Sequence, residues 1–120
     1  RPQAVRRVVS EEAARELTEM LVAALPEETP LGVVPEYVAA GKTGTAQVFE
    51  QGRYDDQAII ASFAGYLPAR DPRFVVLVKL DRPKRQPWGS RAAAPVWRSL
   101  ATELCVYMGI PPDGARLATN

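Results

Sequence analysis

The stretch AAGKTGTAQ, residues 39–47, can be interpreted in two ways that imply different folds. The letters GKT occur in the phosphate-binding loops of nucleotide hydrolases, where the loop opens a helix. That loop needs a glycine five residues before Gly41, whereas position 36 is Glu36. With two glycines, two threonines and a valine, GKTGTAQVF is instead typical of an extended segment. The stretch therefore favours a strand, and a nucleotide-binding loop is the weaker alternative.

The letters KTG in the same stretch match one of three signatures of enzymes that acylate an active-site serine with peptide or β-lactam carbonyls. Three consecutive letters occur by chance too often to establish a function, so the surrounding sequence has to decide. An interpretation without chemistry is an ordinary edge strand, in which Gly44 marks a bulge and Lys42 discourages aggregation. Both interpretations predict a strand over residues 42–48, and only the first places it beside a cleft.

Composition excludes several classes of protein and ligand. The chain has 120 residues, of which 47% are apolar, enough for one modest domain. Its 15 basic and 14 acidic residues nearly balance, so nothing supports a nucleic-acid partner. The sequence has no histidine, the commonest zinc ligand, and Cys105 is its only cysteine, which excludes an internal disulfide. The apolar neighbours of Cys105 predict a buried packing residue rather than a reactive thiol.

Hydrophobic spacing predicts a helix near each end of the chain. Apolar residues recur at three- and four-residue intervals after Ser10, a natural helix cap, and Pro26 is expected to end this helix. In the second helix Pro95 fits the first turn, Trp97 is a packing residue and Gly109 marks the end. The apolar face expected for this helix consists of Val96, Leu100, Ala101, Leu104 and Met108.

Between the helices, three apolar segments predict strands over residues 38–49, 58–67 and 74–80. The polar stretches 51–57 and 68–73 connect them, and such short connections predict an antiparallel meander. We therefore expect an α+β fold in the order helix, three-stranded antiparallel meander, helix. The second and third strands are apolar on both alternating faces, which predicts cover on both sides and more covering material than this chain supplies.

Four segments occur in the order and at the spacings found in one enzyme family. They are VSEEAARELTEML (residues 9–21), AAGKTGTAQ (39–47), ASFAGYLPARDPRFVVLVKLDRP (61–83) and AAPVWRSLATELCVYMGIPPD (93–113). Together they resemble the C-terminal part of the transpeptidase domain of penicillin-binding proteins, which implies the fold shared with serine β-lactamases. KTGTAQ is more similar to the monofunctional class B group than to class A, the alternative. The strand pair is more similar to division-type proteins than to elongation-type ones.

The sequence lacks the nucleophile of this family. The reactive serine of the family lies in S-x-x-K and a second serine in S-x-N. None of the serines in the sequence fits either pattern; they are Ser10, Ser62, Ser90 and Ser99. The chain also opens on RPQAVRR, without an initiator methionine. We therefore expect residues 1–120 to be the C-terminal segment of one transpeptidase domain, inactive without the part that carries the serine motifs.

The resemblance implies roles for residues of the KTG strand. Lys42 would place a positive charge beside the hydroxyl groups of the other two motifs and near the substrate carboxylate. Thr43 and Thr45 would offer hydroxyls to that carboxylate, and the backbone N–H of Thr45 would be an oxyanion-hole donor. Gly44 would let the substrate peptide approach the strand edge as an added strand. Trp88, in the loop before the last helix, is a candidate for the rim of the cleft.

The resemblance also implies partners and a location. The substrate would be the peptidoglycan stem peptide, the inhibitors β-lactam antibiotics, and no cofactor or metal would be needed. The serine-bearing N-terminal segment would complete the site, and a membrane glycosyltransferase and other division or elongation proteins are candidate partners. The protein would act outside the cytoplasmic membrane, on an N-terminal transmembrane anchor absent from this chain. The alternative is a degenerate, non-catalytic peptide- or partner-binding module, which β-lactam would not label because covalent capture needs the serine.

Overall fold

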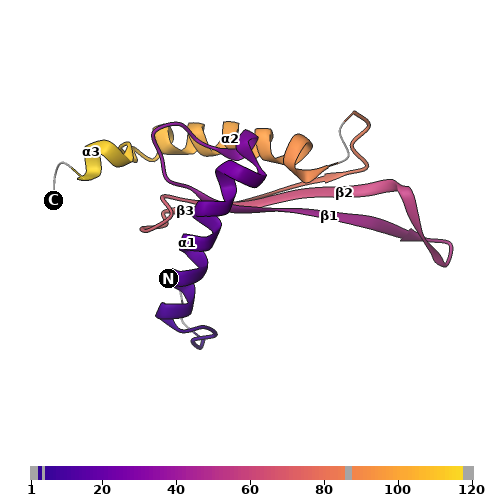
Figure 1. Cartoon of the computed structure of the whole chain (residues 1–120), viewed down its shortest axis with the longest axis horizontal. Coiled ribbons are helices and arrows are strands. Elements are labelled where there is room, and N and C mark those ends of the chain that lie inside the picture. Colours follow the sequence, from indigo (N-terminus) through magenta and orange to yellow (C-terminus); the bar gives the residue numbers. More distant parts are fainter. Residues whose placement is uncertain (1–2, 4, 86–87, 118–120) are drawn as a thin grey trace.

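Two helices and a three-stranded sheet make up most of the fold (Figure 1). The computed structural model describes residues 3, 5–85 and 88–117. The elements in chain order are α1 (Glu11–Glu28), the short 3-10 helix η1 (Pro30–Gly32), β1 (Ala40–Glu50), β2 (Arg53–Leu67), β3 (Phe74–Asp81), α2 (Gly89–Tyr107) and α3 (Asp113–Leu117). The predicted order of helix, three strands and helix is confirmed, and α3 is an addition that the sequence pattern did not indicate.

Helix α1 begins where the sequence predicts, after Ser10, but it ends two residues beyond the predicted end. The hydroxyl of Ser10 caps it by accepting a hydrogen bond of 3.1 Å from the backbone N–H of Ala13. The predicted end at Pro26 is wrong, because Pro26 lies inside the helix. A proline lacks the N–H that would bond to the preceding turn, so it removes one backbone hydrogen bond of the helix. Because only two helical residues follow Pro26, few other hydrogen bonds are disturbed. The helix closes when the N–H of Thr29 bonds to the carbonyl of Leu25 at 3.0 Å.

The three strands form an antiparallel meander in the order β1-β2-β3, as predicted. The polar stretch 51–57 is not a loop, however, because β2 already begins at Arg53. Only Gln51 and Gly52 form the turn, with φ angles of 52° and 81°. Positive φ at both central residues is the requirement of the tightest hairpin turns, whose twist matches that of the strands they join. The hairpin therefore extends well beyond the rest of the sheet (Figure 1).

Helix α2 starts earlier than predicted and buries a different face. Trp88 is its N-cap residue, so Pro95 lies in the helix interior rather than in the first turn. Val96, Leu100 and Met108, expected on the apolar face, are exposed. The prediction holds for Ala101, which is buried. The other side chains that α2 buries are small or aromatic, namely Ala93, Ala94, Trp97 and Cys105. The buried packing predicted for Trp97 and Cys105 is confirmed.

The core lies between α2 and one face of the sheet. The rings of Phe63 and Trp97 pack with their centroids 5.0 Å apart, and the indole N–H of Trp97 donates to the carbonyl of Val76 at 3.2 Å. A Cβ on Gly65 would lie 2.5 Å from the Trp97 ring, so the helix packs very close to β2. This close approach explains why α2 presents alanines to the sheet and turns its larger aliphatic side chains outward.

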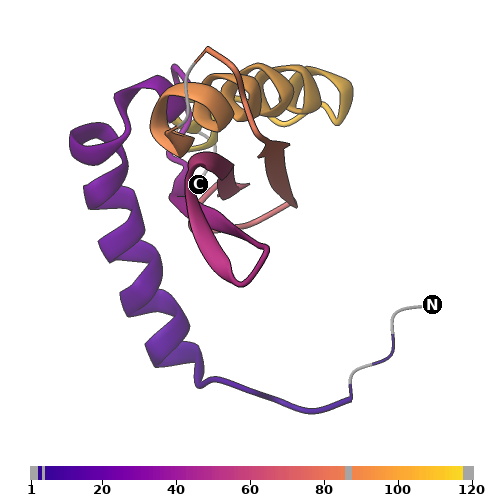
Figure 2. The same cartoon turned by 90° about the vertical axis from the view of Figure 1, so that its right-hand side faces the viewer.

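The opposite face of the sheet is covered only in part. Val75 and Leu77 on β3 are 73% and 66% exposed. The sequence predicted cover on both faces of the sheet, and within the described part of this chain only the face that packs on α2 is fully covered. Helix α1 crosses this region and extends away from the sheet (Figure 2). A groove of about 530 Å³ separates its outer turns from the sheet, lined in part by Leu17, Tyr66, Phe74 and Val75. None of the described helices is long and apolar enough to cross a membrane.

Candidate functional site

The KTG residues lie on a strand whose outer edge is open. Within the described residues, β1 is an edge strand of the sheet and pairs only with β2, with Lys42 opposite Ala64 and Thr45 opposite Ala61. An edge strand presents unpaired backbone N–H and C=O groups to any chain that lies beside it. Because Lys42 and its neighbours belong to a strand and open no helix, the nucleotide-binding alternative is wrong.

Two glycines let β1 pack closely against β2. A Cβ on Gly41 would lie 2.5 Å from the Phe63 ring, and a Cβ on Gly44 would lie 2.5 Å from the hydroxyl oxygen of Ser62. The Ser62 hydroxyl donates to the carbonyl of Gly44 at 3.3 Å. Gly44 therefore accommodates a neighbouring side chain of the sheet, a role that the sequence pattern did not indicate.

Lys42 places a cation at the start of this strand. Its side chain is 57% exposed, and its ammonium nitrogen lies 3.1 Å from a carboxylate oxygen of Glu28, at the end of α1. The same nitrogen is 3.5 Å from the hydroxyl oxygen of Thr43. An exposed ion pair of this kind contributes at most about 1 kcal/mol, so Glu28 could be displaced by a competing anion at little cost. Sequence reasoning missed Glu28, because only the fold brings the end of α1 to β1.

The start of α2 packs against the other KTG residues. The backbone N–H of Gly89 points to the hydroxyl oxygen of Thr45 at 3.5 Å. A Cβ on Gly89 would lie 2.6 Å from the carbonyl oxygen of Ser62 and 2.8 Å from that of Gly44. This contact brings Trp88, the preceding residue and 57% exposed, to the side of Thr45. The structure thus places all five predicted site residues in one region.

A hollow lies close to Lys42 at the junction of the two helices. It has a volume of about 600 Å³ and is lined by Glu28, Pro30, Leu31, Ser90 and Arg91. Arg91 is the second cation of this region, and neither Ser90 nor Arg91 was predicted to belong to the site. The sequence did contain a signal that could have indicated them, because Ser90 and Arg91 are two polar residues directly after Gly89, at the start of a helix that continues with apolar residues.

The arrangement suits binding of an extended, anionic ligand. Lys42 supplies a positive charge, Thr43 and Thr45 supply hydroxyl donors, and the open edge of β1 supplies backbone groups for an added strand. Activation of a serine is a different task that needs an adjacent base. Ser62 instead donates to a backbone carbonyl, and the chain has no histidine. Among the described residues, no group of three or more acidic, cysteine or histidine side chains could hold a metal ion.

The sequence is similar to known cell-wall enzymes over most of its length. Residues 1–102 match the family described as penicillin binding protein transpeptidase domain. The chain is 35% identical to stage V sporulation protein D of Bacillus subtilis, over 92% of this chain and 18% of that protein. It is 34% identical to the probable peptidoglycan D,D-transpeptidase PenA of Neisseria meningitidis, over 89% of this chain and 19% of that protein. The chain therefore spans about a fifth of the length of these curated relatives.

Solved structures agree with the fold. The transpeptidase domain of penicillin-binding protein 3 from Burkholderia pseudomallei is 32% identical and superposes with a TM-score of 0.84, over 94% of this chain and 35% of that one. Penicillin-binding protein 3 from Mycobacterium tuberculosis, in complex with ampicillin, is 35% identical with a TM-score of 0.79, over 88% of this chain and 26% of that one. The match to the C-terminal part of such a domain confirms the α+β fold class predicted from the sequence.

Proposed function

Because the chain belongs to the penicillin-binding protein transpeptidase family, with class B members among its relatives, we propose that it forms part of a peptidoglycan D,D-transpeptidase. Such an enzyme cross-links cell-wall stem peptides through a serine acyl-enzyme and is acylated by β-lactams. The observation that carries the proposal is the open strand edge on which Lys42, Thr43 and Thr45 lie together. In this proposal the chain supplies the wall of the site that binds substrate, and another segment supplies the nucleophile.

Lys42 has two tasks in the proposed mechanism. Its charge stabilises the terminal carboxylate of the stem peptide or of a β-lactam, and it favours proton movement at the serine hydroxyl groups of the other two motifs. Its present partner is the exposed carboxylate of Glu28 at 3.1 Å. Since that pair is weak, an incoming carboxylate or the serine-bearing segment exchanges with Glu28 without a large penalty.

The two threonines and the strand backbone complete the wall. The hydroxyls of Thr43 and Thr45 donate to the substrate carboxylate, and Trp88 forms the rim of the cleft beside Thr45. The backbone N–H of Thr45 is the second oxyanion-hole donor, paired with the N–H of the reactive serine. Substitution of the Thr45 side chain removes the hydroxyl that donates to the substrate carboxylate, but it leaves the backbone N–H of the oxyanion hole in place.

The serine-bearing segment is the first partner of this chain. Exposed apolar side chains on α1 and β3, with the groove between them, form a surface of the kind that interfaces cover. We propose that the N-terminal part of the same transpeptidase domain covers it and brings the serine to Lys42. The family further suggests an extracytoplasmic location with an N-terminal membrane anchor, and contacts with a membrane glycosyltransferase and other division or elongation proteins.

The proposal is tested by penicillin labelling of the full-length protein, followed by denaturing mass analysis and peptide mapping. We expect one drug mass on a serine outside residues 1–120. Lys42→Ala should slow labelling by about a hundredfold or more, the range for losing a group that assists proton transfer. Arg98→Ala, which removes another exposed cation at a position on α2, is the control and should label like the wild type. If the wild-type protein gains no drug mass, the chain is a binding module and the catalytic proposal fails.

A further inference from the structure

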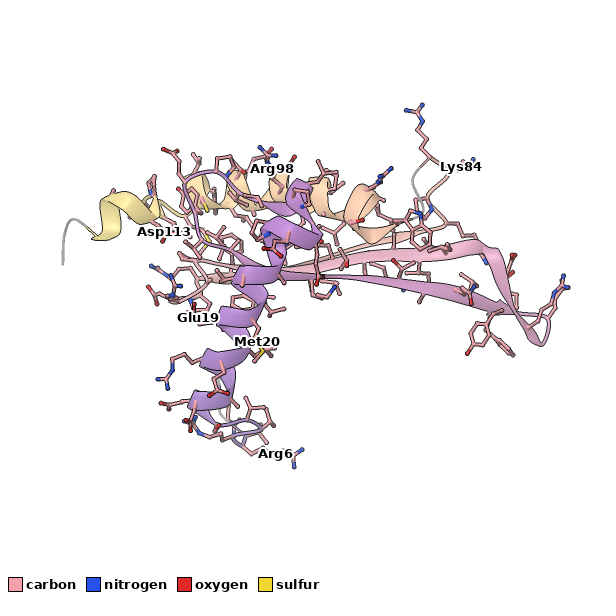
Figure 3. The ribbon with its side chains drawn as sticks, viewed as in Figure 1. Arg6, Glu19, Met20, Lys84, Arg98 and Asp113 are labelled. Atoms are coloured by element: carbon pink, nitrogen blue, oxygen red, sulfur yellow. The ribbon has the colours of Figure 1, made fainter. Side chains whose placement is uncertain are left out.

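The segment after α2 folds back onto the start of the KTG strand. Helix α2 ends in a Schellman motif, in which Gly109 has a φ of 62° and the N–H of Ile110 bonds to the carbonyl of Cys105 at 2.9 Å. The N–H of Gly109 bonds to the carbonyl of Val106 at 3.1 Å. This turn buries Ile110 and directs the chain to Asp113, at the first turn of α3 (Figure 3).

Three hydrogen bonds attach this segment to residues 36–38, just before β1. The hydroxyl of Tyr37 donates to the carbonyl of Ile110 at 2.8 Å, and the N–H of Asp113 donates to the carbonyl of Glu36 at 3.0 Å. The carboxylate of Asp113 accepts from the N–H of Val38. Three consecutive residues are thus held by a segment more than seventy positions away in the sequence. We call these contacts the C-terminal clamp.

The clamped turn needs such support. Glu36 has a φ of 67°, a left-handed conformation that is unfavourable for a residue with a side chain. A residue keeps such a conformation only where its surroundings enforce it. On the other side of the turn, the carbonyl of Val38 accepts from the N–H of Ala69 at 2.8 Å. The direction in which the chain enters β1 is therefore set by the clamp on one side and by the β2–β3 connection on the other.

The clamp lies close to the proposed site along a rigid path. Lys42 follows Val38 by four residues, about 13 Å of extended strand. The two residues after Val38, Ala39 and Ala40, are buried, so the strand has little freedom between the clamp and Lys42. A change in the position of Val38 is passed on to Lys42 and Thr43, because extended backbone that is paired with a neighbour moves as one unit.

We propose that Asp113 is a positioning residue for the transpeptidase site: its carboxylate holds Val38 and thereby fixes where Lys42 and Thr43 stand. The inference rests on the proposed function, in which the placement of these two residues governs acylation. Misplacement of catalytic groups by about 1 Å slows a reaction by up to about a hundredfold, even when the cause is distant. The C-terminal segment after α2 is then part of the catalytic apparatus, although it contacts no substrate.

The test compares two substitutions in the full-length protein. Asp113→Ala removes the acceptor for the Val38 N–H, whereas Asp113→Asn keeps an oxygen acceptor and removes the charge. We expect Asp113→Ala to slow penicillin acylation about ten- to a hundredfold at a temperature where the protein is fully folded. Asp113→Asn should restore most of the rate. Thr102→Val, which removes the 2.8 Å hydrogen bond from the Thr102 hydroxyl to the carbonyl of Arg98 on an exposed part of α2, is the control for a hydrogen bond lost elsewhere in the fold and should acylate normally.

Amide hydrogen exchange gives a readout that does not depend on penicillin. In Asp113→Ala, the amides of residues 38–45 should exchange faster than in the wild type or in Thr102→Val, while those of α2 stay protected. If Asp113→Ala exchanges and acylates like the wild type, or if Asp113→Asn is as slow as Asp113→Ala, the positioning role is overturned. If the wild-type protein is not acylated at all, the proposed function fails, and the exchange of residues 38–45 still decides whether the clamp holds the strand.

Tyr37→Phe is the milder variant for the case that Asp113→Ala does not fold. It removes the hydroxyl that donates to the Ile110 carbonyl and also interacts with the Cys105 thiol, so it weakens the same clamp while both bonds of Asp113 remain. Exchange of residues 38–45 should then rise less than in Asp113→Ala and more than in Thr102→Val. Unchanged exchange in Tyr37→Phe together with a misfolded Asp113→Ala would show that Asp113 serves folding alone, and the inference would be wrong.

Discussion

Helices α1 and α2 have the same kind of sequence pattern and very different surroundings. Both carry apolar residues at helical spacing, and both flank the sheet (Figure 1). Helix α2 buries residues along its whole length, from Gly89 to Cys105. In α1 only Leu25, near the end, is buried, while Leu17 and Met20 are 55% and 65% exposed. The end of α1 thus packs on the core, whereas the apolar face of its earlier turns is exposed among the described residues.

The difference shows that a row of apolar residues predicts that a helix packs against something, but it does not show which segment the helix packs against. The partner of α2 is the sheet, which this chain supplies. The partner of the earlier turns of α1 is, in our proposal, the serine-bearing segment, which covers the exposed Met20 (labelled in Figure 3) and the groove lined by Leu17. Removing contacts from α2 should therefore destabilise the protein most, and removing contacts from α1 should cost more in the full-length protein than the exposure of α1 in this chain predicts.

The largest effect is expected at Trp97, the fully buried centre of the α2 packing. Trp97→Ala removes the ring stacked on Phe63 and the hydrogen bond to Val76, and it leaves a cavity. We expect the free energy of unfolding to fall by about 3–5 kcal/mol in urea denaturation of the full-length protein. Trp88→Ala, an exposed tryptophan on the same helix, is the control and should change it by about 0.5 kcal/mol or less. Equal effects of the two changes would show that α2 is not the core helix.

The next effect is expected where α2 begins. Gly89→Ala places a Cβ 2.6 Å from the carbonyl oxygen of Ser62, a backbone atom that cannot move away cheaply. We expect a loss of about 2–3 kcal/mol and slower penicillin labelling, because the helix start must shift away from Thr45. Gly114→Ala in α3, where a Cβ meets nothing within 4 Å, should be neutral or slightly stabilising. If Gly89→Ala is labelled at the wild-type rate, the packing of Gly89 against the strands is not needed for the function of the site.

The third test concerns α1 directly. Leu17 is 55% exposed here, and substitutions at exposed positions usually change stability by about 0.5 kcal/mol or less. If the serine-bearing segment covers α1, Leu17→Ser should instead cost about 1.5 kcal/mol in the full-length protein, the lower range for a buried leucine. Glu16→Ser, the adjacent exposed position, is the control. A loss no larger than that of the control would mean that α1 stays uncovered and that the apolar face has another role.

The same contrast explains which parts of the fold could be predicted from the sequence. The cap of α1 and the three strands carry local signals, namely Ser10 before an amphipathic run and short apolar segments between polar turns. The start and face of α2 do not, because close packing on Gly65 selects alanines, which carry little hydrophobic contrast. The turn at Gln51 was hidden because polar residues on a projecting hairpin are compatible with a loop or with a strand.

The candidate site was predictable where the chemistry lies in consecutive residues. Lys42, Thr43 and Thr45 follow from one motif, and the structure places them on one open strand edge. Glu28 and Asp113 lie 14 and 71 positions from Lys42, and only the fold brings them to the start of β1. A motif search finds groups that act on a ligand, whereas the groups that hold them in place are found from hydrogen bonds across the fold.

The smallest effect is expected at the ion pair that attaches α1 to the sheet. Arg70 donates two hydrogen bonds of 2.7 Å to the carboxylate of Glu19 (Figure 3), and these bonds hold the pKa of Glu19 below its ordinary value of 4.5. A lowered carboxyl pKa in the folded state stabilises the protein above the unfolded pKa, and this contribution is lost as the pH falls through the folded pKa. We therefore expect the thermal midpoint to fall more steeply in the wild type than in Glu19→Gln between about pH 5 and about pH 3. Glu16→Gln, which makes the same change at an exposed position about one turn before Glu19, is the control and should follow the wild type. Parallel curves for all three proteins would show that the pair does not anchor α1.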